Sequence, residues 1–262
     1  MHSGNETKKL NKILFAALSI LFFLVIWHCG VVFTKIGDII PSPFAIIIEF
    51  FKSFIVPIGK CTMGVHILHS LRRVLVGFVI GATLGIVLGI AMGLNGTVSA
   101  IFKPIFDLIR PIPTIAWIPL AITWFGIGEI TKYFLIFLIT LCNVAINAYD
   151  GVNSVDHDII DAAKMLGAKP HNVFFLIILP ASVPYVFTGL QTALGYGWAT
   201  VVAAEMVRSS EGVGWMIITG QSSNNMMQIM LGIVAVGIVG FCLTSLMRIL
   251  EARLCIWRER GK

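Results

Sequence analysis

An arginine lies inside an apolar segment that also contains several prolines. Residues 103–126 read KPIFDLIRPIPTIAWIPLAITWFG, with Arg110 near the middle. Each proline removes a backbone hydrogen-bond donor, and such irregular backbone is tolerated inside a membrane only where protein or water shields it. A broken helix beside Arg110 would suit the path of an anion, with Pro113 and Trp117 lining it. The alternative is a local ion pair between Arg110 and Asp107, three residues earlier.

A second set of polar residues recurs along a later apolar segment, GLQTALGYGWATVVAAEMVR. Gln191, Trp198 and Glu205 are seven residues apart in turn, so they share one face of a helix. An ionisable residue in a membrane helix normally faces a cavity or a charged partner. We predict that the three line a translocation pathway, with a structural salt bridge of Glu205 as an equal alternative. In an anion pathway, Glu205 would have to be paired, protonated or in contact with the ammonium of a zwitterion.

These polar residues are exceptions in a strongly apolar chain. Of its 262 residues, 57% are hydrophobic and 12% charged, whereas soluble domains carry about 25% charged residues. A membrane-spanning helix needs about 20 apolar residues, so there is room for about five to seven spans and for no soluble catalytic domain. The net charge of +6 comes from basic residues at the ends of apolar segments, which indicates a topology signal in a lipid bilayer and not nucleic-acid binding.

Motifs for covalent chemistry are absent from the sequence. No GxxxxGK[ST] phosphate loop, HExxH or GxSxG occurs, and the five cysteines are dispersed without metal-ligand spacing. We therefore predict no catalytic residues, no metal and no cofactor in this chain. An integral membrane enzyme would need a catalytic cluster that the sequence lacks.

The apolar segments predict an all-α integral membrane protein with six transmembrane helices. The predicted spans cover residues 13–33, 75–94, 103–126, 133–148, 183–207 and 229–250. They divide the chain into an N-terminal tail (1–12), a first transmembrane helix (13–33), an external or interfacial segment (34–64), a five-helix core (65–250) with a charged loop (150–180), and a C-terminal tail (251–262).

Basic residues predict the orientation of these spans. Lysines precede the first span and arginines follow the last, so both tails and loop 150–180 are expected in the cytoplasm. Arg72 and Arg73 lie near the outer end of the second span, against this rule. We interpret them as snorkelling side chains or as part of an interfacial elbow.

Glycine recurs at every fourth position of the second span. Small residues on one stripe let two helices approach closely in a membrane. The stripe predicts tight packing within one chain or, as the alternative, a contact between subunits. Its members are Gly77, Gly81, Gly85, Gly89 and Gly93.

The charged loop has a fixed spacing of residues. Asp161-Ala162-Ala163 is followed after three residues by Gly167, after nine more by Ile177, and after one more by Leu179-Pro180. The stretch DIIDAAKMLG predicts a short helix, with Gly167 suited to a left-handed cap at its C-terminus. Small alanines allow close approach to a partner surface, and Lys164 adds charge. Pro170 then ends the helix and starts the next one in a new direction.

This spacing resembles the cytoplasmic EAA loop of ABC importer permeases, Glu-Ala-Ala-x3-Gly-x9-Ile-x-Leu-Pro, with Asp161 in place of the glutamate. The resemblance continues through HSLRRVLVGF, RPIPTIAWIPLAITWFGIGEITK, GYGWATVVAAEM and EGVGW. It looks like the subfamily that imports nitrate, bicarbonate, taurine and alkanesulfonates, and GWATVVAAEM most resembles the taurine and sulfonate members. The resemblance implies the MetI-like permease fold of type I ABC importers, with a cytoplasmic coupling helix.

The resemblance also implies partners. Members of the family work as two permeases, here a homodimer, with two cytoplasmic ATP-binding cassette subunits that hold ATP and magnesium, and an extracytoplasmic solute-binding protein in a bacterial inner membrane. The residues implied to couple this chain to the ATPase are Asp161, Ala162, Ala163, Lys164, Gly167, Leu179 and Pro180. The implied substrate is a small anion or zwitterion, with taurine or an alkanesulfonate favoured over nitrate or bicarbonate. The alternative function is a secondary transporter or channel that needs no ATPase.

Overall fold

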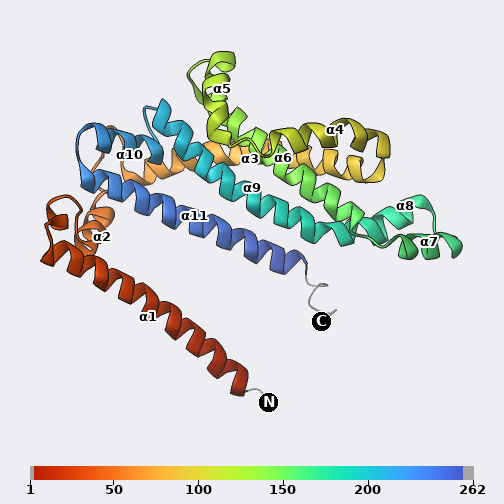
Figure 1. Ribbon diagram of the computed structural model, residues 1–262, viewed down its shortest axis with the longest axis horizontal. Helices are drawn as coiled ribbons and strands as arrows, with labels where there is room; N and C mark the ends of the chain where they lie inside the picture. The colour runs from red at the N-terminus through yellow and green to blue at the C-terminus, as the bar shows by residue number, and fades with distance from the viewer. Residues whose placement is uncertain (1–2, 256–262) are drawn as a thin grey trace. The chain divides into compact units, whose positions relative to one another are not determined.

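The computed structural model describes residues 3–255, and these residues fold almost entirely into helices (Figure 1). The part of the chain that is described contains no β-strand. In chain order the elements are α1 (Ser3–Phe33), η1 (Lys35–Asp38), α2 (Pro43–Lys52), α3 (Met63–Leu94), α4 (Gly96–Ile109), η2 (Thr114–Trp117), α5 (Ile118–Phe125), α6 (Glu129–Asn153), α7 (His157–Met165), α8 (Pro170–Val173), the π-helical turn η3 (Phe174–Ile178), α9 (Leu179–Val207), α10 (Val213–Ser222) and α11 (Met226–Leu254).

The chain divides into two units. The smaller unit consists of the chain up to Met63 together with Met216–Val234, and the larger unit of Gly64–Trp215 together with the chain from Ala235. In the smaller unit, the Ser42 side chain accepts a hydrogen bond from Ala45 N at 3.3 Å and so caps the start of α2. This helix covers the segment that the sequence predicts to lie along the membrane interface.

Four described helices are long and apolar enough to cross a membrane: Met63–Leu94, Glu129–Asn153, Pro170–Val207 and Met226–Leu254. A fifth span is formed if α4 and the η2–α5 segment are taken together, and these are bent by 95° at the break between them. The break follows Arg110, where the sequence predicts it. The apolar part of α1, Ala17–Phe33, is shorter than the other spans, so the count of six stays a prediction.

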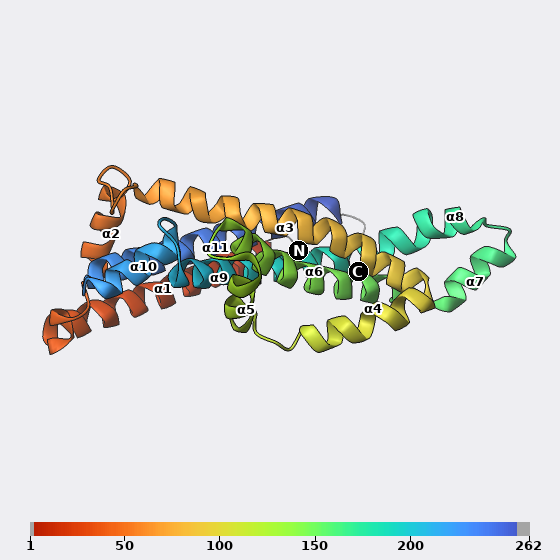
Figure 2. The same cartoon turned by 90° about the horizontal axis from the view of Figure 1, so that it is seen from above.

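The glycine stripe of α3 lies against α6 within the larger unit, where the two helices run side by side (Figure 2). A methyl group added at Gly77 would come within 2.7 Å of Ile136 Cβ, and one at Gly81 within 2.8 Å of the Phe137 carbonyl oxygen. One at Gly89 would collide with the Ala145 carbonyl oxygen. Of the two alternatives for the stripe, the arrangement found is therefore packing within one chain.

Helix α9 packs against the other side of this pair through a similar device. Gly189 of α9 lies against Asn147 of α6, and Gly151 of α6 lies against Tyr185 of α9. The buried cluster between the helices of the larger unit includes Val74, Val144 and other side chains of α3, α6 and α9. The three helices thus form one packed layer that fixes the positions of the polar residues described next.

Candidate functional site

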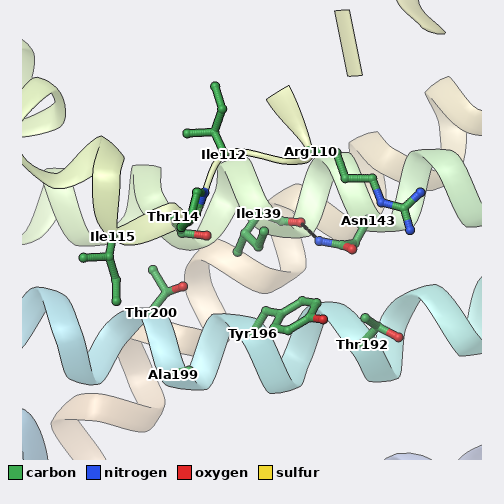
Figure 3. A pocket seen from close by; sticks show the side chains of 11 residues that line it. Arg110, Ile112, Thr114, Ile115, Ile139, Asn143, Thr192, Tyr196, Ala199 and Thr200 are labelled. Atoms are coloured by element: carbon green, nitrogen blue, oxygen red, sulfur yellow. Dashed lines mark hydrogen bonds between the residues drawn. The ribbon is translucent and has the colours of Figure 1, made fainter. Parts of the chain in front are cut away.

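A cavity of about 370 Å³ lies inside the larger unit, beside the break after α4 (Figure 3). Arg110 and the residues up to Ile115 form one wall, and α6 and α9 form the others. The residues that line it are Arg110, Ile112, Pro113, Thr114, Ile115, Ile139, Asn143, Thr192, Tyr196, Ala199 and Thr200. Irregular backbone between helical segments therefore borders an open space, as the prolines predict.

Arg110 does not pair with Asp107. The Asp107 carboxylate binds Lys103 one turn earlier on α4, with Nζ and Oδ2 2.6 Å apart, because those two side chains share an exposed face. The local ion pair weighed as an alternative for Arg110 is therefore wrong. The guanidinium instead lies at one end of the cavity, beside Asn143 (Figure 3).

The other predicted pathway residues are divided between the cavity and the protein core. Pro113 lines the cavity, and Trp117 lines a small void next to it that Arg110 also borders. Gln191 and Trp198 lie outside the cavity lining: Gln191 Nε2 donates to Glu251 Oε2 at 2.6 Å, and the indole of Trp198 donates to the Val236 carbonyl at 3.0 Å.

The cavity residues of α9 were not predicted from the sequence. Thr192, Tyr196 and Thr200 follow one another at intervals of four and carry hydroxyl groups on the neighbouring face of the same helix. Asn143, on the facing helix α6, donates Nδ2 to the Ile139 carbonyl at 2.7 Å. The repeat of hydroxyl residues in an otherwise apolar span is the signal that could have predicted this face.

Glu205 is fully buried in an ion pair with Arg73. Arg73 Nη1 lies 2.8 Å from Glu205 Oε1, and Ser70 Oγ and Gly214 N donate to the same carboxylate at 2.9 and 3.0 Å. The Arg73 guanidinium also forms two parallel hydrogen bonds with Glu129, at 2.7 and 2.8 Å. The salt bridge weighed for Glu205 is therefore present in the structure.

Arg73 itself is 2% exposed, so it does not snorkel, whereas its place in an interfacial elbow stays a prediction. Its charge is neutralised inside the protein by residues of α6 and α9 that lie far away in the sequence. The hydrogen bond from Arg73 Nη1 to the Glu211 carbonyl, at 2.9 Å, also ties the loop after α9 to the network. The network therefore joins α3, α6, α9 and this loop.

The EGVGW segment that follows α9 is shaped around this carboxylate. A side chain at Gly212 or Gly214 would collide with Glu205, so only glycine fits at both positions. Gly212 N donates to His66 Nδ1 at 3.1 Å, and the His66 ring stacks on Trp215 with ring centroids 5.2 Å apart. These residues form a structural junction at one end of α9.

The charged loop contains the predicted short helix, α7. The Asp156 side chain caps its start by accepting from Asp158 N at 3.0 Å, which places the cap two residues before the predicted first residue. Gly167 has a φ of 84°. Gly167 N donates to the Lys164 carbonyl at 2.9 Å and Ala168 N to the Ala163 carbonyl at 3.0 Å, and this pair of bonds is the Schellman motif that a left-handed glycine permits.

Two large apolar side chains lie exposed at the end of α7. Met165 is 84% and Leu166 is 89% exposed. Asp161 and Lys164 form an exposed ion pair at 3.0 Å on the same helix. Figure 1 shows α7 and α8 projecting beyond the ends of α6 and α9.

Leu179 and Pro180, the last residues of the spaced loop, lie at the start of α9. The π-helical turn η3 occurs directly before them. Pro180 has no N–H to donate to the preceding turn, and a wide turn at this point is one way a helix accommodates such a loss.

A set of long apolar helices around a cavity, with a capped helix projecting beyond them, is the arrangement of a multi-pass membrane protein. Residues 81–255 match the family described as binding-protein-dependent transport system inner membrane component. This match covers more than half of the chain, and the chain belongs to that family.

Full-length relatives agree with this assignment. The chain is 36% identical over 239 residues to the taurine transport system permease protein of Escherichia coli K12, covering 89% of this chain and 86% of the relative. It is 32% identical over 246 residues to the nitrate import permease protein of Synechocystis, covering 92% and 89%. The resemblance predicted from the loop is confirmed, and the chain is a permease subunit of an ABC importer.

Solved structures confirm the fold. An amino acid ABC transporter crystallised with histidines is similar with a TM-score of 0.63 and 14% identity, covering 80% of this chain and 98% of that one. The methionine ABC transporter in an inward-facing conformation gives a TM-score of 0.53 and 21% identity, covering 70% and 90%. The predicted all-α type I importer permease fold is therefore confirmed, whereas the orientation of the termini stays a prediction.

Proposed function

We propose that this permease carries a small anion or zwitterion, with taurine- or alkanesulfonate-like solutes favoured over nitrate and bicarbonate. In this proposal a solute-binding protein delivers the solute to a homodimer of the chain. Two separate ATPase subunits, which hold ATP and magnesium, drive the transport through α7. The exposed apolar end of α7 is the observation that carries the proposal.

Exposed Met165 and Leu166 give α7 a surface for an ATPase subunit. Two adjacent apolar side chains that lie almost entirely outside the protein are energetically unfavourable in water, and burial against a partner would remove that cost. Asp161 and Lys164 provide a polar rim beside them, as interfaces commonly have. Ala162 and Gly167 leave room for the partner's backbone to approach.

Contacts at the base of α7 connect it to the helices that form the cavity. Ala163 and Ala168 pack against a buried cluster of Val152 at the end of α6, Val155, and Val173 and Ile178 ahead of α9. A displacement of α7 would therefore be transmitted to α6 and α9, because packed cores move as discrete units and do not deform smoothly. ATP binding in the partner would then favour one state of the permease over another.

The cavity supports the choice of an anion. Arg110 is the one charged residue among those that line it, and no carboxylate is in that lining. The similarity to taurine and nitrate permeases agrees with this charge. An anion would therefore meet favourable charge at this point of the chain.

Reconstitution in proteoliposomes tests the proposal. The chain would be combined with its ATPase subunits and solute-binding protein, and uptake of radiolabelled alkanesulfonate would be measured. We expect uptake only when ATP and both partners are present. Uptake by the chain alone, driven by an ion gradient, would instead establish the secondary transporter.

A further inference from the structure

The Arg110 guanidinium interacts electrostatically with the Asp150 carboxylate of α6 but does not form a direct ion pair with it. Among the described residues, no carboxylate or side-chain acceptor forms an ion pair or hydrogen bond with its guanidinium, because Asp107 is bound to Lys103. An ionisable residue in a membrane-spanning region normally faces a partner or a polar cavity. The Arg110 cavity thus has a cation at one end.

Hydrogen-bonding groups gather at the same end of the cavity. Figure 3 shows Asn143 beside Arg110, Thr192 across the cavity on α9 at the same end, and the hydroxyl of Tyr196 pointing toward that end. A planar guanidinium forms paired hydrogen bonds with oxyanions, and hydroxyl groups can donate to the remaining oxygens. The Arg110 end therefore suits an oxyanion head group.

The other end of the cavity is formed by apolar side chains together with Thr114 and Thr200 (Figure 3). Ile112 and Ile115 lie there on the wall that follows Arg110, and Ala199 lies there on α9 (Figure 3). Ligand pockets typically pair an apolar body with a few polar groups that fix orientation. An alkyl chain attached to the oxyanion would reach this end.

No acidic group lines the cavity, and Asp150, which interacts electrostatically with Arg110, lies outside the lining. Glu205 of α9, an acidic residue predicted to lie on the pathway, is 0% exposed and bound to Arg73, Ser70 and Gly214. An amino group entering the cavity would lose water without gaining an ion pair.

We propose that the Arg110 cavity is a binding site for alkanesulfonate-type anions, with the oxyanion at Arg110, the alkyl chain at Ile112 and Ile115, and no subsite for an amino group. This inference rests on the proposed function and narrows its substrate class. The site would bind a plain alkanesulfonate at least as well as the zwitterion taurine.

Calorimetric titration of the permease–ATPase complex tests this inference, without the binding protein so that its own selectivity does not enter. The probes are ethanesulfonate, butanesulfonate and taurine. Each buried methylene contributes about 0.8 kcal/mol, so butanesulfonate should bind about tenfold more tightly than ethanesulfonate. Taurine should bind no more tightly than ethanesulfonate. The inference would be overturned if taurine bound tenfold more tightly than ethanesulfonate, or if no sulfonate bound at all.

Matched variants assign the binding to Arg110. Arg110→Gln should weaken butanesulfonate binding by about tenfold or more, since hydrogen bonds to charged groups are the strong ones. Lys103→Gln removes a cation of the same helix outside the cavity and should leave binding unchanged. Tyr196→Phe, which removes only a hydroxyl, should weaken binding about three- to tenfold even if the Arg110 variant fails to fold. Unchanged binding in Tyr196→Phe, or equal losses in both basic-residue variants, would contradict the site.

Failure of this inference is distinguishable from failure of the proposed function. ATP-dependent uptake by the reconstituted complex tests the function without reference to the cavity. Uptake that persists at the wild-type rate in Arg110→Gln would remove the site and leave the importer intact.

Discussion

Arg73 and Glu205 hold together three helices and a loop of the larger unit. Both side chains are almost entirely buried, and they belong to an ion-pair network that also includes Glu129 and Lys132. The spacing of Glu205 in the sequence predicts a buried face but cannot identify its partner, because Arg73 lies on a helix far away in the chain. Long-range pairing of this kind depends on the packed fold.

Arg73→Met tests the structural role of this pair. It leaves Glu205 buried without its cation, so we expect the free energy of unfolding in detergent to fall by about 3–5 kcal/mol. Lys103→Met breaks the exposed pair with Asp107 and should change it by at most about 1 kcal/mol. Similar changes in the two variants would contradict a structural role.

Around the cavity, features that depend on neighbouring residues in the chain could be predicted, and features that depend on contacts between distant helices could not. The prolines beside Arg110 are neighbours in the chain, so the sequence predicted both the break and its functional candidate. Asn143 and Tyr196 come from other helices, and their convergence on Arg110 depends on how α6 and α9 pack. Trp198 was predicted to line the pathway because helical spacing shows which residues share a face of a helix. The spacing does not show whether that face contacts a cavity or another helix.

At the scale of elements, α7 is the best-predicted part of the molecule. Its C-terminal bonds join residues within six positions of one another, so the local sequence determines them. The partner of the α3 glycine stripe could not be predicted, since the same stripe serves contacts within and between subunits. The structure places α6 against it.

Gly89→Ala tests the packing of α3 on α6. The added methyl group would overlap the Ala145 carbonyl oxygen, and overpacking of this kind typically costs about 1–3 kcal/mol. Gly237 of α11 has nothing within 4 Å of the position of an added methyl group. Gly237→Ala should therefore keep or slightly raise the free energy of unfolding. Thermal unfolding of both purified variants measures this difference, and a stable Gly89→Ala would contradict the contact.

For the whole molecule, the apolar segments predicted the fold class, because a membrane span can be recognised from the composition of about 20 consecutive residues. They did not predict that α3 begins at Met63, well before the predicted start at 75, or that the third span bends by 95°. Amphipathic residues at the start of α3 reduced its apolar signal. The bend depends on where the backbone groups that lose their hydrogen bonds at a proline can be shielded from lipid by protein or water.

We propose that α7 joins this permease to an ATPase and that the movement of α7 reaches the cavity through α6 and α9. The double variant Met165→Ser, Leu166→Ser tests it most directly, because both side chains are exposed and their loss should leave the fold intact. His157→Ser, a change at the exposed first residue of α7, is the matched control.

Co-purification with the ATPase and ATP-dependent alkanesulfonate uptake in proteoliposomes would be measured together for both variants. We predict that the double variant loses most of its association with the ATPase and that its uptake rate falls at least about tenfold. Each of the two apolar side chains, when buried against the ATPase, would contribute about 1.5–3 kcal/mol to association. The His157 variant should retain both. Normal association and normal uptake in the double variant would contradict the account.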